Sequence, residues 1–560
     1  MKSPKLFASS LSLIILTLAA PSSRSGDGPE PPRSIISISV CSPNAGGASV
    51  SCPNGTRDTA LPVLAPNGDQ VNNYGGLATL ADEHSTIFPP GMFPRHPDYL
   101  LFVATRTNLN VISSGVVALT GGSGPNKNGQ WILDFAPDYG RYFPNSAIGE
   151  QNGQVFLSPV EHRLCPSASD AKLQDQTFDL NYADPGSVVL DPTNRANKGP
   201  GSLIMVYEGS NRCIGLTGGD NVLAGNSFYS TIAVATSNDF GRTWPAYRYM
   251  LDPNGAPTYP LPSQNPTSGP EAPSGATGKS VCIGNDCTAA PWPPDNNYGR
   301  YAVLHPQATI ADAMQSPVTK GGLSNSMGDA VPSAFVDDAR AGHEFGFDDD
   351  GHAPMYLYEL HNYAVGPPGL DFPPLPNGQN SDLMIARAQL NGGTAPLVFK
   401  KWYQGKFSES GRGGFETPIF PSGAFENCEA TGQLKTMGSL SYVDVTQQYL
   451  LTFVCISPHG DPGSQLPGPG AAWFFSTNYD LSRQDQWSTP QEITGSWSPF
   501  DPKSKNCNDY NGWYPSFMSL NHKPGHLTTS GYVFYMKGCT GGDTPGGRQF
   551  STRAFAMTTK

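Results

Sequence analysis

One three-part pattern recurs five times along this 560-residue chain, at uneven spacing. Each copy opens with a serine ahead of a short apolar segment, and the five serines are Ser85, Ser187, Ser333, Ser439 and Ser516. An aromatic-rich segment comes next, at residues 99–102, 203–207, 355–358, 449–453 and 532–535. A third segment with strand character follows at residues 115–120, 231–235, 383–388, 472–475 and 548–557. Most copies then close near a tryptophan, namely Trp131, Trp244, Trp402 or Trp487.

This repetition constrains the fold because a sheet of three or four short strands cannot bury both of its faces alone. Five such sheets packed around a common axis bury their faces against one another, which is the arrangement of a β-propeller. The pattern therefore predicts an all-β, five-bladed β-propeller with long Gly/Pro-rich loop insertions. The alternative is a β-sandwich whose strands share this spacing by coincidence.

Composition is consistent with a β-rich chain that carries large loops. The sequence contains 63 glycines and 54 prolines, a share well above average that disfavours long helices. Its 38% hydrophobic and 10% aromatic residues are too many for a disordered chain. Glycine and proline gather especially in residues 252–297 and 364–381, which we expect to be insertions between strands.

The N-terminus has the three parts of a secretory signal. Lys2 and Lys5 are positively charged, residues 6–20 are apolar, and small residues follow up to Gly26. We expect residues 1–25 to be a signal peptide, residues 26–75 an N-terminal extension and residues 76–560 a single propeller domain. The mature protein would be secreted, extracellular or periplasmic, without a membrane span, and a monomer. The alternative is an apolar run that stays uncleaved as an anchor.

The cysteines indicate an oxidising compartment. All 10 lie beyond the signal, and an even number in an exported chain predicts disulfide bonds. Cys41 with Cys52, and Cys282 with Cys287, have the spacing of short disulfide loops, while the other pairings stay open. The spacings match no zinc site.

The formal net charge of −12 argues against a nucleic-acid partner, because little positive charge is present to neutralise phosphates. No motif predicts an organic cofactor. One acidic run, Asp348, Asp349 and Asp350, could bind Ca²⁺ or could be a solvated loop.

The strongest short motif spans residues 237–244, Ser-Asn-Asp-Phe-Gly-Arg-Thr-Trp. It fits the pattern Ser-x-Asp-x-Gly-x-Thr-Trp, the Asp-box of sialidases and other propellers. Asp and Gly shape a tight turn in this motif, and the Trp packs between sheets. A degenerate copy begins at Ser476 and ends at Trp487. We interpret the motif as a fold element on an outer hairpin, away from any active site.

Three segments together resemble a blade of the five-bladed glycoside hydrolases, which include the arabinanase, β-xylosidase and invertase types. They are residues 184–189 (Asp-Pro-Gly-Ser-Val-Val), 205–209 (Met-Val-Tyr-Glu-Gly) and 232–237 (Ile-Ala-Val-Ala-Thr-Ser). Residues 401–408 (Lys-Trp-Tyr-Gln-Gly-Lys-Phe-Ser) look like a segment of bacterial relatives. The resemblance extends over roughly residues 75–560. It implies an axial funnel in which three acids act as general base, pKa modulator and general acid.

Aligning the copies on their serines identifies candidate acids. Asp82 and Asp184 occupy the same position, three residues before the serine, and Asp329 lies four residues before its serine. The resemblance implies Asp82 as the base, Asp184 as the pKa modulator, and as the acid either Glu208 or Glu359, which follow tyrosines that we take as equivalent. Inverting glycosidases hold acid and base about 6.5–9.5 Å apart. Each carboxylate could instead shape a turn.

Four further residues are candidate substrate contacts. Trp513 and Tyr514 precede the last inner strand and could stack on a sugar ring. His361 lies near Glu359, and Arg212 is one of the arginines that a sialidase mechanism would need. The sequence therefore favours a secreted carbohydrate-active protein that is a glycoside hydrolase. The alternatives are a sialidase-type hydrolase and a non-catalytic propeller that binds glycan or protein.

Overall fold

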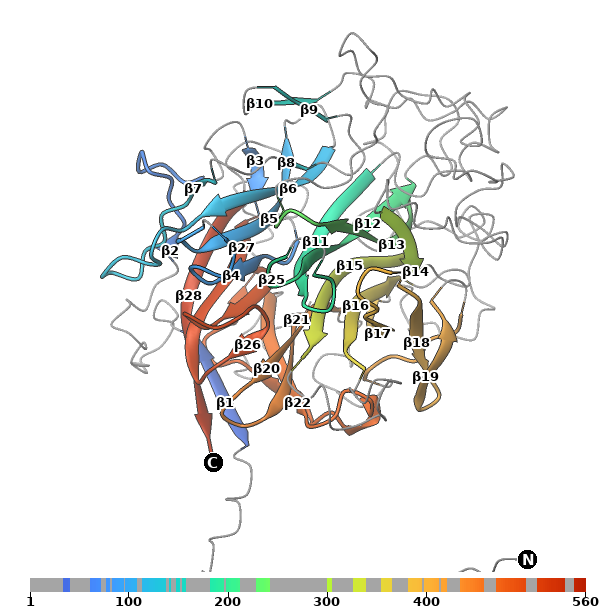
Figure 1. The fold of residues 1–560 in the computed structure, drawn as a ribbon. Coiled ribbons are helices and arrows are strands. Elements are labelled where there is room, and N and C mark those ends of the chain that lie inside the picture. The colour runs from blue at the N-terminus through green and yellow to red at the C-terminus, as the bar shows by residue number, and fades with distance from the viewer. Residues whose placement is uncertain are drawn as a thin grey trace, which may run out of the picture.

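The computed structural model is built almost entirely of β-strands over the residues that it describes (Figure 1). These are residues 34–40, 61–71, 77–80, 83–94, 96–107, 113–136, 141–142, 148–151, 154–157, 182–195, 198–211, 228–241, 300–304, 326–338, 354–364, 381–394, 397–411, 414–420, 434–457, 470–499, 511–538 and 548–560.

Five small sheets stand in a ring and form a five-bladed β-propeller, which confirms the predicted fold class (Figure 1). We number the blades I to V in chain order. Their inner strands are β4 (Thr86–Phe88), β11 (Tyr182–Asp191), β15 (Ser326–Asp337), β20 (Leu434–Val443) and β25 (Asn511–Met518). Four of these strands contain the recurring serine, and in blade I the serine directly precedes β4. The serines of the sequence pattern therefore mark equivalent places in the five blades.

The second and third segments of the pattern form the middle strands of the blades. The second strands are β5 (Leu100–Thr107), β12 (Ser202–Asn211), β16 (Tyr356–Ala364), β21 (Gln448–Ser457) and β27 (Ser530–Gly538). The third strands are β6 (Ser113–Thr120), β13 (Phe228–Ser237), β17 (Ser381–Gln389), β22 (Gly470–Asn478) and β28 (Arg548–Thr559). The predicted segments lie within these strands to within one residue.

Shorter strands complete the individual sheets. Blade I adds β3 (Leu77–Leu80), β7 (Asp134–Phe135) and β8 (Arg141–Tyr142), and blade II adds β14 (Arg300–Leu304). Blade III ends in the hairpin of β18 (Phe399–Tyr403) and β19 (Lys406–Ser410), and blade IV adds β23 (Gln491–Glu492) and β24 (Ser498–Pro499). A separate hairpin joins β9 (Ile148–Gln151) to β10 (Gln154–Leu157), and the one described helix is the short η7 (Gln484–Gln486).

The two ends of the described chain meet in blade V. Strand β1 (Ile35–Val40) pairs antiparallel with the C-terminal strand β28, and β2 (Leu61–Pro62) pairs with the same strand (Figure 1). Residues of the segment that we expected to precede the propeller thus supply the outer strand of its last sheet. Ile35, Ile38 and Val40 of β1 are buried, Ile38 completely, while Ile36 is exposed.

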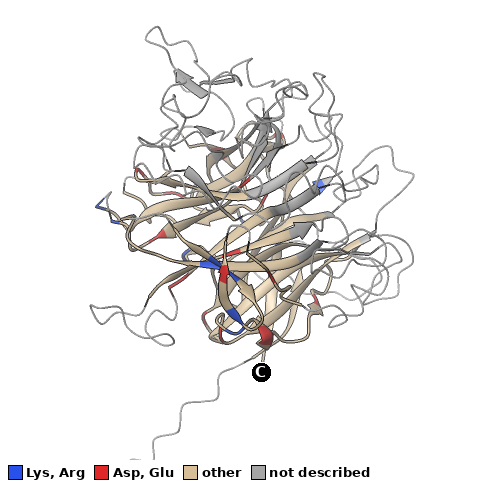
Figure 2. Cartoon of the chain, turned by 90° about the vertical axis from the view of Figure 1, so that its right-hand side faces the viewer, with Lys and Arg blue, Asp and Glu red and all other residues tan. Residues whose placement is uncertain are grey.

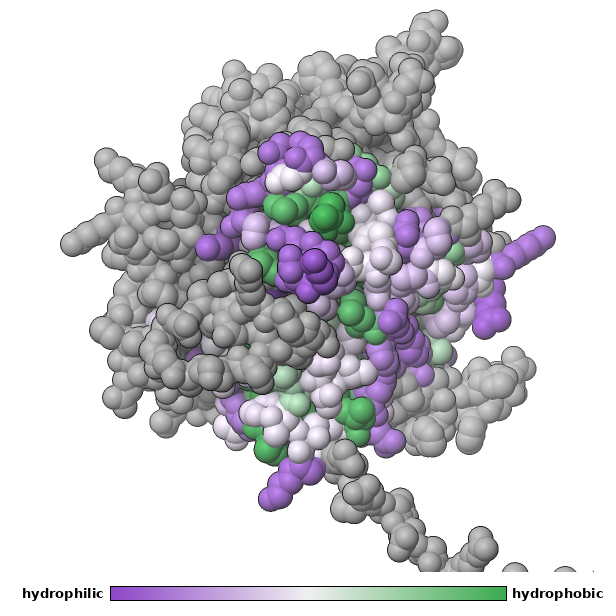
Figure 3. Space-filling model, turned by 90° about the vertical axis from the view of Figure 1, so that its left-hand side faces the viewer, coloured by the Kyte–Doolittle hydropathy of each residue, from purple (hydrophilic) through white to green (hydrophobic). Residues whose placement is uncertain are grey.

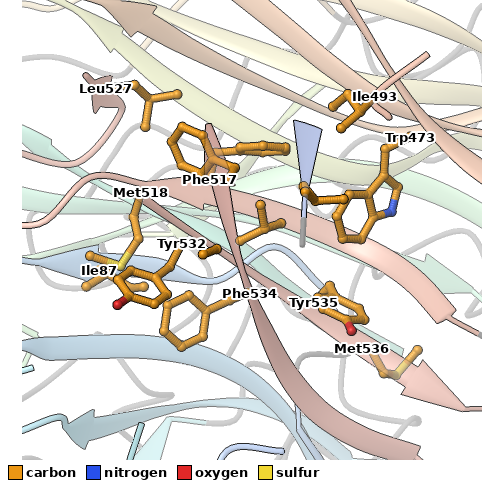
Figure 4. Packing of buried hydrophobic residues seen from close by; sticks show 14 of the residues in the cluster. Ile87, Trp473, Ile493, Phe517, Met518, Leu527, Tyr532, Phe534, Tyr535 and Met536 are labelled. Carbon is orange, nitrogen blue, oxygen red and sulfur yellow. The ribbon is translucent and has the colours of Figure 1, made fainter. Parts of the chain in front are cut away.

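Large aromatic side chains fill the seams on both sides of blade V. The Trp473 ring of blade IV lies 5.1 Å from that of Tyr535, and the Trp131 ring of blade I lies 5.2 Å from that of Phe534. Figure 4 shows Trp473 and Ile493 beside the aromatic residues of β25 and β27. Trp402 packs in the seam between blades III and IV. Burial of the apolar surface of these side chains is the main driving force for assembling the ring.

Charged side chains are sparse on the described strands, in agreement with the composition (Figure 2). On the face shown in Figure 3, hydrophilic and hydrophobic residues are interspersed over the described part. Within that part of the chain, no helix has the length and apolar character needed to span a bilayer.

Several predictions fall on residues outside the described ranges. They are the signal peptide, the insertion at 252–297, most of 364–381, the acidic run at 348–350, and every cysteine except the buried Cys455 in β21. The Asp-box is described only as far as Gly241, where Ser237 Oγ accepts from the Gly241 amide at 2.9 Å. Its tryptophan, Trp244, lies beyond, so the complete motif stays a prediction.

Candidate functional site

The N-terminal halves of the inner strands meet at one end of the propeller axis, which we call the acid end. In blades II to V, the pairing register shifts just before the recurring serine. Two residues before that serine, Val331, Met437 and Tyr514 have φ of 57°, 55° and 54°. A left-handed backbone is costly for such residues, and strain of this kind gathers at functional sites. The bulge therefore recurs at the same position in these blades and is a regular structural feature of the acid end.

Hydrogen bonds from neighbouring blades hold these strained residues. Glu208 Oε2 in blade II accepts from the backbone amide of Val331 in blade III at 3.2 Å. Asn362 Oδ1 in blade III accepts from the amide of Met437 in blade IV at 3.3 Å. Both side chains are nearly buried. The same type of hydrogen bond thus joins consecutive blades. A carboxylate accepts it between blades II and III, and a side-chain amide accepts it between blades III and IV.

The register brings three of the predicted acids to this end of the axis. Asp184 is the Cα partner of Glu208 across β11 and β12. Asp329 lies two residues before Val331, whose amide Glu208 binds. For Asp184 and Asp329 the structure describes the backbone position, while Asp82 and Arg212 lie outside the described residues. Two blades therefore present three carboxylate-bearing positions around one strained bulge.

Glu208 and Glu359 are not equivalent, contrary to our expectation from the sequence. Glu208 pairs with Asp184, three residues before the serine of its blade, whereas Glu359 pairs with Ala334, one residue after its serine. The true counterpart of Glu208 in blade III is Asn362, which pairs with Ala330. Tyrosines occur at several places in these strands, so the tyrosine before each glutamate did not define the register.

Glu359 belongs to a buried polar network in blade III. Its Oε2 lies 2.7 Å from His361 Nδ1, and His361 Nε2 lies 2.8 Å from Glu416 Oε2. The other Glu416 oxygen accepts from Lys401 Nζ. Burial alone would raise the pKa of Glu416, but the charges of Lys401 and His361 outweigh it and lower this pKa to about 2. The network contains charges of both signs, as buried charges require.

The same network encloses His361. We predicted His361 as a substrate contact, but its side chain is 0% exposed and each ring nitrogen faces a carboxylate. Glu359 is likewise 0% exposed. On their strand, both alternate with Tyr358 and Leu360, which face blade IV, and share a side with Leu357, which packs against blade II. They therefore lie in a seam between blades rather than at a surface open to substrate.

Two residues that follow Asp82 are buried beside the acid end. Glu83 and His84 are each 2% exposed, and the His84 ring meets that of Tyr514 edge-on at 5.9 Å. Burial lowers the pKa of His84 to about 4, although the nearby backbone of Pro515 and Met437 acts in the opposite direction. We did not select His84 from the sequence. The sequence does contain a signal for it. His84 directly precedes the recurring serine, a position at which the other four copies have glycine or proline.

The two predicted aromatic contacts have different environments. Trp513 is 2% exposed and belongs to the hydrophobic cluster around blade V. Tyr514 is partly exposed and lies next to His84 at the acid end. Stacking on a sugar requires an accessible ring face, so Tyr514 is the better placed of the two.

The described residues include no group of three or more His, Cys, Asp or Glu side chains arranged to hold a metal ion.

Comparison with known proteins gives only distant likenesses. No protein-family profile matches the chain, and no curated protein matches it. Among solved structures, it is similar to an N-acetylgalactosamine deacetylase from F. plautii, with 11% identity, 89% of this chain and 94% of that chain covered, and a TM-score of 0.36.

Two further solved structures are similar at the same level. One is the GH93 α-L-arabinofuranosidase of Fusarium graminearum, with 10% identity, 86% of this chain and 98% of that chain covered, and a TM-score of 0.32. The other is a B. megaterium levansucrase mutant, with 10% identity, 92% and 90% covered, and a TM-score of 0.35. At these TM-scores the backbones differ substantially, so the likenesses establish no activity for this chain.

Proposed function

We propose that this chain is a secreted glycoside hydrolase whose carboxylates act at the acid end of the propeller axis. The observation that supports this most directly is that Glu208 binds the strained Val331 of blade III and pairs across its sheet with the backbone position of Asp184. The backbone position of Asp329 lies two residues before Val331. Glycoside hydrolysis needs one carboxylic acid to protonate the leaving oxygen and a second carboxylate to activate water or attack the sugar. Different blades can deliver such groups across a shared axis.

Within this proposal, Glu208 is the general acid and Glu359 is not. Glu359 is completely buried and held by His361, so it has no path to a glycosidic oxygen. Glu208 is held on one oxygen by the Val331 amide, and it faces the backbone position of Asp184 across the sheet. We assign the role of base to Asp82 and that of pKa modulator to Asp184. Tyr514 is the candidate for stacking on the sugar ring.

A substrate screen tests the proposal. Wild-type protein and Asp184→Asn are assayed against aryl glycosides and plant polysaccharides, with Asp485→Asn as the control in an exposed ion pair of blade IV. We expect wild type and the control to hydrolyse at least one substrate. Asp184→Asn should lose about 100-fold or more in kcat, because the general acid would lose the carboxylate that adjusts its pKa and acid–base catalysis usually contributes that much.

The same screen includes a binding measurement that separates the alternatives. Glycan binding by wild type and Asp184→Asn alike, with no hydrolysis by either, would support a non-catalytic propeller and contradict the proposal. Secretion is tested separately by expressing the full chain in a secreting host and sequencing the N-terminus of the exported protein. Cleavage near residue 25 is expected, and retention of residues 1–25 would contradict it.

A further inference from the structure

A cavity of about 80 Å³ lies along the axis, beyond the recurring serines and away from the acid end. Residues from all five inner strands or the segments just before them line it, including the hydroxyl-bearing Ser85, Ser187, Ser439, Ser441 and Ser516. A polar cavity of this size can hold ordered water. Only one segment outside the inner strands and their flanks contributes a continuous stretch among the described residues, and that segment runs from His522 to His526.

This segment belongs to the connection between β25 and β27, and it contacts three other blades. It ends at the first residue of the short strand β26 (His526–Leu527), which pairs in parallel with β20 of blade IV. The Asn521 amide donates to Tyr99 Oη of blade I at 3.0 Å, and that hydroxyl donates back to Asn521 Oδ1 at 3.1 Å. The Tyr442 amide of blade IV donates to the Gly525 carbonyl at 2.7 Å. Gly525 also packs against Phe335 of blade III, where a Cβ would come within 2.9 Å of the ring. Residues 519–526 thus cover the cavity, and we call them the lid.

Ionic contacts fasten the C-terminal part of the lid. His526 Nδ1 lies 2.7 Å from Asp444 Oδ1 of blade IV, and His526 Nε2 lies 2.9 Å from Asp338 Oδ1 of blade III. Lys523 Nζ donates to Asp338 Oδ2 at 2.6 Å, and His522 Nδ1 lies 3.3 Å from Asp444 Oδ2. We call these five side chains the latch. Both His526 contacts are hydrogen bonds to carboxylates only when both ring nitrogens carry a proton.

The backbone of the lid turns at two residues and leads directly into a buried residue. Asn521 and Gly525 have φ of 60° and 79°, which sets them apart from the extended strands on either side. Leu527, directly after the lid, is completely buried in the core. Lys523 is 43% exposed and His522 35% exposed. The middle of the lid is therefore held by polar contacts that water and salt can weaken. Its ends are buried, because Leu520 packs against the core and His526 is 6% exposed.

We propose that residues 519–526 form a lid over the axial cavity, held shut by the latch, and that opening of the lid admits small solutes to the cavity. The groups facing His526 are Asp338, Asp444, Lys523, His522 and the Tyr442 ring, which lies 5.5 Å away. Opening is a local event, because the blades keep their aromatic seams when the latch breaks. This proposal is independent of the hydrolase assignment.

Acid should release the latch. Burial acts to raise the pKa of Asp338, but hydrogen bonds from His526 and Lys523 outweigh it and hold the pKa below its usual value. A carboxyl with a depressed pKa contributes stability above its unfolded-state pKa and loses it as the pH falls through the folded value. Lid opening is therefore expected on acidification below the ordinary range of aspartate.

Hydrogen exchange of the full-length protein tests the lid, with the Tyr442 amide as reporter because it donates to the lid. We expect His526→Gln to lower protection at Tyr442 at least tenfold while protection at Val533 in β27 stays unchanged. Lys523→Gln alters an exposed side chain, so it tests the proposal even if His526→Gln does not fold, and it should lower protection at Tyr442 by a smaller factor. The matched control is Arg483→Gln, which breaks an exposed ion pair elsewhere in blade IV.

Thiol labelling measures access to the cavity itself. Ser441 lines the cavity and is 5% exposed, and Ser441→Cys would place a thiol there. We expect slow labelling by a small thiol reagent at pH 7, at least tenfold faster labelling when His526→Gln is added, and no change when Arg483→Gln is added. Equal labelling rates would overturn the lid. Protection at Tyr442 that is unchanged in Lys523→Gln, or protection lost equally in every blade, would also overturn it.

Discussion

At the scale of single residues, blade III encloses a network of buried ionisable side chains. Glu359, His361, Glu416 and Lys401 come from two strands and a following segment, and they meet in one network. Their sequence separations carry no motif, so the network could not be predicted. The same is true of His84, whose burial depends on blades IV and V. Aligning the repeats within the chain on their serines located Asp184 and Asp329, because each serine occupies the same place in its blade.

Removing Lys401 should be costly because Glu416 would be left buried without its cation. We expect Lys401→Gln to lower the free energy of unfolding by about 3–5 kcal/mol, the usual cost of breaking a buried ion pair from one side. Lys406→Gln in the same blade, at an exposed position, should change it by less than about 0.5 kcal/mol. Urea denaturation measures both. Equal effects of the two substitutions would contradict the network.

His84 predicts a pH dependence of stability. Its folded pKa of about 4 lies below the ordinary histidine pKa of 6.5, so the unfolded chain binds a proton over this range while the folded chain does not. Stability should fall as the pH drops from about 6.5 to 4, by on the order of 3 kcal/mol from this residue. Denaturation at pH 7 and pH 4 should show a smaller loss for His84→Gln than for wild type. Equal losses would exclude a buried, neutral His84.

At the scale of strands, the pattern of serine, aromatic segment and third segment located the inner and middle strands of every blade. The pattern did not predict the register in which these strands pair. Glu208 and Glu359 both follow a tyrosine, but they lie on opposite sides of the bulge. Glu208 pairs three residues before the serine of its blade, and Glu359 pairs one residue after its serine. The pattern also did not show that β1 completes blade V, because pairing between the two ends of a chain leaves no local signal.

Strand β1 provides a test of ring closure with an internal control. Ile38 is 0% exposed and Ile36 is 45% exposed on the same strand. We expect Ile38→Ala to lower the free energy of unfolding by about 2–5 kcal/mol, the usual cost of truncating a buried isoleucine. Ile36→Ala should cost less than about 0.5 kcal/mol. Equilibrium denaturation compares the two, and a near-zero effect of Ile38→Ala would mean that β1 does not close the ring in solution.

At the scale of the whole molecule, the two ends of the axis have different chemistry. The acid end gathers carboxylate positions around strained bulges, and the opposite end has a hydroxyl-lined cavity under an ionic lid. The ring arrangement could be predicted because repeated half-buried sheets have few ways to pack. The function of each end could not be predicted, because it depends on which side chains of neighbouring blades lie next to one another.

The proposed role of Glu208 is acid catalysis at the acid end, and Glu208→Gln tests this role with little structural disturbance. The glutamine can keep the hydrogen bond to the Val331 amide, since the Asn362 amide makes the same contact in the next blade. The measurement is kcat for glycoside hydrolysis together with the Tm of each protein. We predict an unchanged Tm and a kcat lowered by about 100-fold or more. A Glu208→Gln protein as active as wild type would exclude Glu208 as the general acid.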